Sequence, residues 1–316
     1  MNKITQNIRT LAKQLLEEKT VDSVIGFQQA SLAHMTRPFM AKTIEDAQEL
    51  VFNCNCRMNL TNYLSGLKNK VGIVVKGCDS RNLVTQLIEN RINRDQVYII
   101  GVPCTGLADK TKLLNTAKGL DIVSVEDDDD TIVIKTDNCS MSIEKEEILQ
   151  DNCRTCIRHN PVIHDVLAGP AVPESEIQDR FKDVEKIEAL NPDDKKAFFT
   201  DLLDTCIRCY ACRDACPLCY CPTCFVDESR PQWVGKTTDP VDTRTYHLVR
   251  AFHDAGRCTD CGACEAACPM NIPIRVFTRK TIKDCVQYFG VEAGMDETLR
   301  PALDKFSLED PQPFIR

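Results

Sequence analysis

The stretch CIRCYACRDACP at residues 206–217 recurs as CTDCGACEAACP at residues 258–269. Each stretch spaces its cysteines by three, three and four residues and follows the last one with proline, the run that holds cubane iron–sulfur clusters. By chance, three more cysteines fall at these offsets from a given one with odds of roughly 2 in 10,000 for such a run. Structural zinc sites usually combine two Cys-x2-Cys pairs instead. The two stretches therefore predict two 4Fe-4S clusters.

The spacing also predicts how the clusters share their ligands. Two-residue gaps wrap three thiolates around one corner of a cubane, and the fourth cysteine serves the neighbouring cluster. The first cluster is thus assigned the ligands Cys206, Cys209, Cys212 and Cys268. The second is assigned Cys258, Cys261, Cys264 and Cys216.

Helix-like stretches lead into both motifs, one after Pro192 and one over residues 243–255. This repeated unit predicts a mainly helical, dicluster ferredoxin-type domain over residues 193–316. Residues 166–192 are rich in proline and charge and predict a linker. Three arginines flank cluster ligands: Arg208 and Arg213 in the first motif, and Arg257 before the second. They are either solvated surface residues, or they raise the potential of a cluster or dock an acidic partner.

Residues 1–165 predict an α/β domain with a small parallel or mixed sheet. Apolar runs at 71–75 and 97–100 predict buried strands, and the segment between them predicts a helix that begins at Asp79 or Ser80. Strand, helix and strand in this order form a βαβ unit with parallel strands. Helices are also expected at 1–20, 45–51 and 60–64, and strands at 24–27 and 131–136.

Cysteines of the N-terminal domain predict another site. Cys78 and Cys104 follow the two buried strands, so they lie at the same sheet edge, where α/β folds bind ligands. Cys153 and Cys156 supply half of a cluster site. These four cysteines are a candidate third 4Fe-4S site, with Cys56 as a reserve ligand. The alternative is a set of structural thiols with a lone Cys-x2-Cys hairpin.

The start of the predicted helix is also a candidate anion site, because helix N-termini bind phosphate. Its candidate ligands for a flavin phosphate of FAD, or for another anion, are Gly77, Asp79, Ser80 and Arg81. The glycine signature of a dinucleotide site is missing from this stretch. Three more cysteines follow the first motif and either pack near its cluster or bind a further metal: Cys219, Cys221 and Cys224.

Composition limits the classes of function. Nineteen cysteines in a chain without a recognisable signal peptide favour metal ligation over disulfides, since cytosolic thiols stay reduced. A net charge of −8 argues against nucleic acid as a partner. Apolar runs are only a few residues long, whereas a membrane span needs about 20. A cytoplasmic location is expected.

Several segments resemble the beta-subunit family of coenzyme F-420-reducing hydrogenases and formate dehydrogenases, most closely its shorter, dicluster-containing members. They are the segments 74–81, 100–104 and 230–236, the Cys153–Cys156 pair with Asn160-Pro161, and the tandem cysteine motifs. The resemblance implies electron transfer between a molybdenum, tungsten or nickel–iron catalytic subunit and a flavin or deazaflavin acceptor, such as a heterodisulfide-reductase-like flavoprotein.

The leading prediction is therefore an iron–sulfur electron-transfer subunit of an anaerobic oxidoreductase complex. One alternative is a flavin-containing beta subunit that itself reduces coenzyme F-420 or a related acceptor. Another is a scaffold whose clusters are structural. The sequence identifies no catalytic acid, base or nucleophile.

Overall fold

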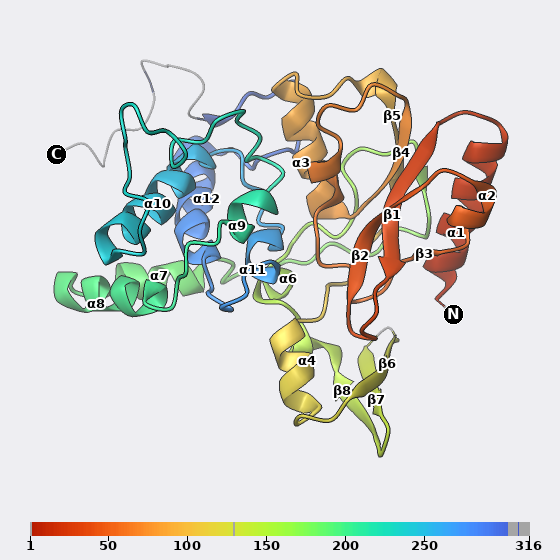
Figure 1. Ribbon diagram of the computed structural model, residues 1–316, viewed down its shortest axis with the longest axis horizontal. Helices are drawn as coiled ribbons and strands as arrows, with labels where there is room; N and C mark the ends of the chain where they lie inside the picture. Colours follow the sequence, from red (N-terminus) through yellow and green to blue (C-terminus); the bar gives the residue numbers. More distant parts are fainter. Residues whose placement is uncertain (1, 129, 303–308, 310–316) are drawn as a thin grey trace.

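The computed structural model describes residues 2–128, 130–302 and 309, and its N-terminal half is built on a mixed β-sheet (Figure 1). Four strands run parallel, and two others pair antiparallel with β1. The sheet order is β2 (Thr36–Ala41), β1 (Ser23–Gln29), β4 (Val71–Val75), β5 (Val97–Gly101) and β9 (Val166–Leu167), and β3 (Leu50–Val51) pairs with β1. The predicted fold class, with a mixed sheet, is confirmed.

The predicted βαβ unit forms the centre of this sheet. β4 has the predicted bounds, and all five of its residues are buried, as expected for a parallel strand covered on both faces. The helix that follows, α3 (Gly77–Ile88), begins earlier than predicted. The reason is that the Asp79 carboxylate accepts the backbone N–H of Lys76 at 3.3 Å, which places Asp79 inside the first turn.

Helix α1 (Lys3–Glu17) buries Ile8, Ala12 and Leu15 against the sheet. The helix predicted over 45–51 is shorter, because α2 (Ile44–Ala47) spans four residues and β3 follows it at once. A capping box between Thr43 and Asp46 starts α2. The segment predicted as a helix near residue 60 is the single 3₁₀ turn Leu60–Tyr63.

A small antiparallel sheet forms a separate lobe, seen at the bottom of Figure 1. Its apolar centre contains Leu113, Ile132, Ile134 and Ile148. Of its strands, only the middle one was expected from the sequence. The elements of the lobe are α4 (Lys110–Thr116), β6 (Ile122–Asp127), β7 (Thr131–Thr136), β8 (Ser140–Glu144) and α5 (Lys145–Ile148), with α6 (Asp151–Arg154) leading back to the main body.

The C-terminal region is helical, as predicted. Its helices are α7 (Lys182–Glu188), α8 (Pro192–Leu203), α9 (Ala211–Asp214), α10 (Pro240–His253), α11 (Ala263–Ala266) and α12 (Arg275–Phe289). Helices α8 and α10 are the two predicted leading helices, and α9 and α11 lie inside the cysteine motifs. Strand β9 and α7 fall in the segment predicted as a linker. The division into 1–165, 166–192 and 193–316 stays a prediction.

Helix α3 lies between the sheet and the helical region (Figure 1) and makes polar contacts with the latter. Asn82 Nδ2 donates to Thr259 Oγ1 at 2.7 Å, and Gln86 Nε2 donates to the carbonyl oxygen of Pro217 at 2.8 Å. Both contacted residues belong to the cysteine motifs. The packing of α3 therefore places the motifs close to the carboxyl ends of β4 and β5. Within residues 2–128 and 130–302, no helix has both the length and the apolar run needed to cross a membrane.

Candidate iron–sulfur sites

The first-site cavity lies between α9, α10 and the end of the second motif. Its lining includes all four cysteines assigned to the first cluster: Cys206, Cys209, Cys212 and Cys268. Two side chains of α10 form part of its wall. Tyr246 Oη lies 3.4 Å from the Sγ of Cys212, and His247 Nε2 lies 3.4 Å from the Sγ of Cys206. The structure thus brings Cys268 to the first motif, as crosswise ligation requires.

The two motifs share an unusual backbone. Arg208 and Tyr210 flank the second cysteine of the first motif with φ angles of 49° and 61°. Asp260 and Gly262 flank the equivalent cysteine of the second motif with φ angles of 59° and 74°. Positive φ is uncommon for residues other than glycine, so the same pair of left-handed residues indicates the same turn. This turn leads into α9 and α11 and sets the second and third cysteines of each motif.

The second site gathers the cysteines of the second motif with Cys216. Burial raises the pKa of Cys261 to about 11, and the nearby Cys216 thiol contributes to the shift. Burial and Cys216 also raise the pKa of Cys264. Cys216 therefore faces the second motif. The Sγ atoms of Cys216 and Cys219 and a carboxylate oxygen of Asp254 lie within 4.8 Å of one another.

The structure also places the three cysteines that follow the first motif. Cys219 lies beside a thiol assigned to the second cluster rather than the first. Cys221 is exposed, and Cys224 is partly buried. All three line an open cavity between α10 and the segment after the first motif.

The third-site cavity lies at the carboxyl edge of the main sheet. It is lined by Cys78 in the first turn of α3, Cys104 after β5, and Cys153 and Cys156 in and after α6. Its volume is ≈ 40 Å³, whereas one water needs about 10–15 Å³. The structure thus brings together the four cysteines predicted for a third cluster, and their role as ligands stays a prediction. The reserve ligand Cys56 is buried elsewhere, beside Asn53.

The donor set of this cavity suits a cubane. Four thiols from three segments of the chain converge, which is the ligand number of a 4Fe-4S cluster. Burial raises the pKa of Cys104 to about 11 and also raises that of Cys153. Buried thiols become metal ligands when a cation offsets the cost of the thiolate charge.

The second and third sites are neighbours. Cys261, assigned to the second cluster, lines the third-site cavity. Thr259 Oγ1 donates to the carbonyl oxygen of Cys78 at 3.2 Å, so a hydrogen bond joins the two sets of cysteines. Burial raises the pKa of Cys78, and Cys261 contributes to this shift. The cysteines assigned to the second site therefore lie beside the third-site cavity.

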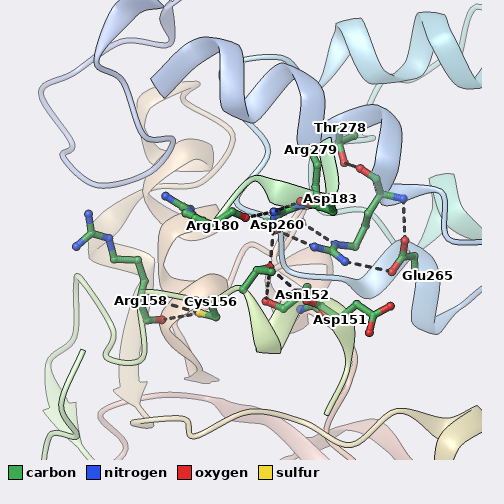
Figure 2. A network of polar contacts seen from close by, with 12 residues as sticks. Asp151, Asn152, Cys156, Arg158, Arg180, Asp183, Asp260, Glu265, Thr278 and Arg279 are labelled. Atoms are coloured by element: carbon green, nitrogen blue, oxygen red, sulfur yellow. Dashed lines mark hydrogen bonds and ion pairs between the residues drawn. The ribbon is translucent and has the colours of Figure 1, made fainter. Parts of the chain in front are cut away.

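An ion-pair network fixes the second motif between these sites (Figure 2). Asp260, between two predicted ligands, accepts from Arg275 Nε and Arg279 Nη1, both at 2.7 Å. Arg279 also donates to Asp183 at 2.8 Å, which ties α12 to α7. Burial alone raises the pKa of Asp260, but the two arginines outweigh it and hold that pKa below its ordinary range. The sequence carries no local signal for this network, because its members lie far apart in the chain.

The three arginines that flank the motifs, for which solvated surface and a role at a cluster or partner were the alternatives, have partners within the chain. Arg208 Nη1 donates to the carbonyl oxygen of Gly235 at 2.6 Å and so anchors the loop that follows the extra cysteines. Arg213 pairs with Asp227, at 2.9 Å. The third, Arg257, pairs with the carboxylate of Glu89 at the end of α3.

The residues predicted for a flavin phosphate or another anion occupy the first turn of α3: Gly77, Asp79, Ser80 and Arg81. The chain itself engages their polar groups. Asp79 pairs with Lys76 at 2.7 Å, and Ser80 Oγ accepts the N–H of Val162 at 2.9 Å. Arg81 Nε donates to the carbonyl oxygen of Ala293 at 2.9 Å. A Cβ atom on Gly77 would lie 2.4 Å from the carbonyl oxygen of Arg158, so the chain covers this helix end.

The paired cysteine motifs are matched by a known family model. Residues 202–272 match the family model of the 4Fe-4S dicluster domain, so this part of the chain is such a domain. Along nearly its whole length, the chain is similar to the F420-dependent formate dehydrogenase subunit beta of Methanocaldococcus jannaschii, with 26% identity over an alignment of 356 positions that covers 93% of this chain and 93% of that protein. The predicted resemblance to such beta subunits is confirmed.

A second relative and one solved structure are also similar to the chain. The F420-dependent formate dehydrogenase 1 subunit beta of Methanococcus maripaludis is 26% identical over 361 residues, covering 94% of this chain and 92% of that protein. A chain of the F420-reducing NiFe hydrogenase complex from Methanosarcina barkeri is a distant structural likeness, with 18% identity and a TM-score of 0.39 over 49% of this chain and 62% of that chain.

Proposed function

We propose that the chain is an iron–sulfur electron-transfer subunit that holds three 4Fe-4S clusters in a row. The position of Cys261 carries this proposal, because its side chain belongs to the second site and also lines the third-site cavity. When bound, each cluster takes up and releases one electron at a time. A side chain that contacts two sites keeps their clusters close together, as electron transfer between them requires. Clusters with a purely structural role need not be adjacent.

The cysteines and their neighbours hold the row and limit access of water to it. Tyr246 and His247 cover the first site from α10, and Asp260 with its arginines fixes the turn between the second and third sites. At the first site, Cys209 is exposed, and the exposed side chains of Ile207 and Met270 line the same cavity. This end of the row is the place for electron exchange with another subunit.

The partners follow from the relatives. Those proteins are named as beta subunits of formate dehydrogenases, so the donor here is the catalytic subunit of a formate dehydrogenase or hydrogenase. The acceptor is a flavoprotein of the heterodisulfide-reductase-like kind. Each electron received from the donor passes to the acceptor, so the chain itself is unchanged over a cycle. A flavin on this chain is less well supported, because the polar groups at the start of α3 already have partners.

The third site gives the sharpest test. The full chain, purified or reconstituted without oxygen, is expected to hold about twelve irons, four for each cubane. Replacing Cys104→Ser or Cys153→Ser removes about four of them, since a cubane needs its four thiolates. The matched control is Cys139→Ser, which changes an exposed thiol outside the three sites and leaves the iron content unchanged. A wild-type chain with about eight irons, unchanged by Cys104→Ser, contradicts the third site.

A further inference from the structure

Three arginines meet one carboxylate beside the third-site cavity. The guanidinium groups contact Glu292 at these distances: Arg81 at 3.3 Å, Arg158 at 2.8 Å and Arg180 at 2.9 Å. They come from α3, from the segment after Cys156, and from the segment before α7. Burial favours a neutral Glu292, but the arginines, Arg81 foremost, hold its pKa below the ordinary value. The carboxylate is therefore charged and is shared among three cations.

This group leaves positive charge at the cavity. All three arginines line the cavity, and Glu292 balances only one of them. The other charged groups of the lining have partners of their own, because Lys76 pairs with Asp79, and Asp260 pairs with arginines of α12. The lining thus carries an excess of cations that the described residues do not neutralise.

One atom of the group has no partner. The Nε of Arg180 is buried and has no hydrogen-bond acceptor among the described residues. A buried cationic donor without a partner loses its hydration and destabilises the fold unless an acceptor is supplied. An excess of cations and an unpaired donor at one enclosed cavity are the features of a site for an anion. Four cysteine thiolates around a cubane make such an anion.

We infer that Arg158 and Arg180 are the charge partners of the cluster in the third site and raise its reduction potential above that of the second site. The inference rests on the proposed third cluster. Reduction adds one electron, supplied by the donor, and so one negative charge to the cluster. Nearby cations stabilise that charge, as do hydrogen bonds to the cluster sulfurs. The arginines therefore draw the electron toward the N-terminal end of the row.

The charges around the second site are balanced by comparison. Asp254 pairs with Arg250 at 3.5 Å, and Asp260 pairs with Arg275 at 2.7 Å. Extra electron density is thus less favourable at the second site than at the third.

The test is an EPR-monitored redox titration of the full, cluster-loaded chain with dithionite and mediators. Arg180→Gln and Arg158→Gln are expected to lower the midpoint potential of the signal that Cys104→Ser abolishes. Glu292→Gln is expected to raise it, because the substitution removes a negative charge. Arg180→Lys keeps the charge and restores most of the potential. A general loss of packing would not produce shifts of opposite sign.

The matched control is Arg154→Gln, which removes an arginine of α6 whose ion pair with Glu146 is largely exposed and which does not line the cavity. Its potential is expected to equal that of the wild type. Iron content separates the two proposals. A chain with about twelve irons whose third midpoint does not move in Arg180→Gln or Arg158→Gln overturns the inference alone. A wild-type chain with about eight irons overturns the third cluster itself.

Discussion

Burial and neighbours separate the cysteines of this chain into different chemical roles. Cys139 is exposed at the edge of the small lobe, where its Sγ lies 3.3 Å from the Oγ1 of Thr136. Cys153 is partly buried in a cavity with three other thiols, and burial raises its pKa. A thiol that burial holds protonated binds a metal only by releasing its proton, so cluster assembly is coupled to deprotonation. The same residue type is thus an exposed thiol at one position and a candidate ligand at the other.

Crosswise ligation makes a prediction about single cysteines. Cys268→Ser is expected to abolish or alter the same EPR signal as Cys209→Ser, because both thiols line the first-site cavity. Cys216→Ser should instead affect the signal that depends on Cys261. The measurement is low-temperature EPR of the dithionite-reduced chain, with Cys221→Ser, an exposed cysteine outside both sets, as the control. If Cys268 and Cys261 variants damage one common signal, each motif ligates its own cluster.

At the scale of elements, the contact between the end of α12 and the start of α3 holds the two halves together. Gly294 has a φ of +70°, and a Cβ atom there would lie 2.0 Å from the carbonyl oxygen of Arg81. Gly290, four residues earlier, has a φ of +64° with no described atom within 4 Å of its Cβ position. Alanine at Gly290 would therefore introduce backbone strain alone, whereas alanine at Gly294 would introduce backbone strain and a steric clash.

Gly290→Ala is expected to cost about 1–2 kcal/mol, the strain of a left-handed alanine. Gly294→Ala adds a clash with backbone, so its cost should exceed about 3 kcal/mol, which is large for one substitution. Urea unfolding of the full chain, followed by circular dichroism, measures both. Equal losses of stability in the two variants would show that α3 and the 290–294 turn do not pack as described.

The elements that the sequence predicts best are those with a strong local pattern. The β-branched runs at 71–75 and 97–100 predict β4 and β5, because parallel strands are buried on both faces and need continuous apolar residues. Strand β2 was not expected, because it contains Pro38 and is half-exposed, which only an edge strand tolerates. The two-residue strands β3 and β9 have no pattern of their own and exist only through their partners.

For the whole molecule, some features of the candidate sites could be predicted from the sequence and others could not. The convergence of Cys78 and Cys104 could be predicted, because consecutive parallel strands end at one sheet edge. The charges around them could not, since Arg180, Asp260 and Glu292 meet from distant parts of the chain without any motif. Metal ligands have a spacing that the chemistry imposes. Their charge environment depends on how the helical region packs on α3.

The row of sites leads to a prediction for the assembled complex. The full chain alone is expected to be bleached by dithionite and to show no formate-dependent turnover, because in the proposed function the catalytic subunit oxidises the substrate. Adding the catalytic subunit of a formate dehydrogenase should let formate reduce the clusters. Cys209→Ser is expected to abolish this transfer, since it disrupts the exposed end of the row. The rate is measured by stopped-flow absorbance of the clusters after mixing with formate.

Two controls make the outcome specific. The catalytic subunit should keep its formate oxidation with an artificial dye when it is paired with Cys209→Ser, which shows that only the transfer between subunits is lost. Cys221→Ser, also exposed but outside the first-site cavity, should transfer electrons like the wild type. Transfer that survives in Cys209→Ser but fails in Cys104→Ser would place the donor at the third site and reverse the direction of the row. Formate-dependent turnover by the isolated chain with bound flavin would instead support a beta subunit that reduces its acceptor itself.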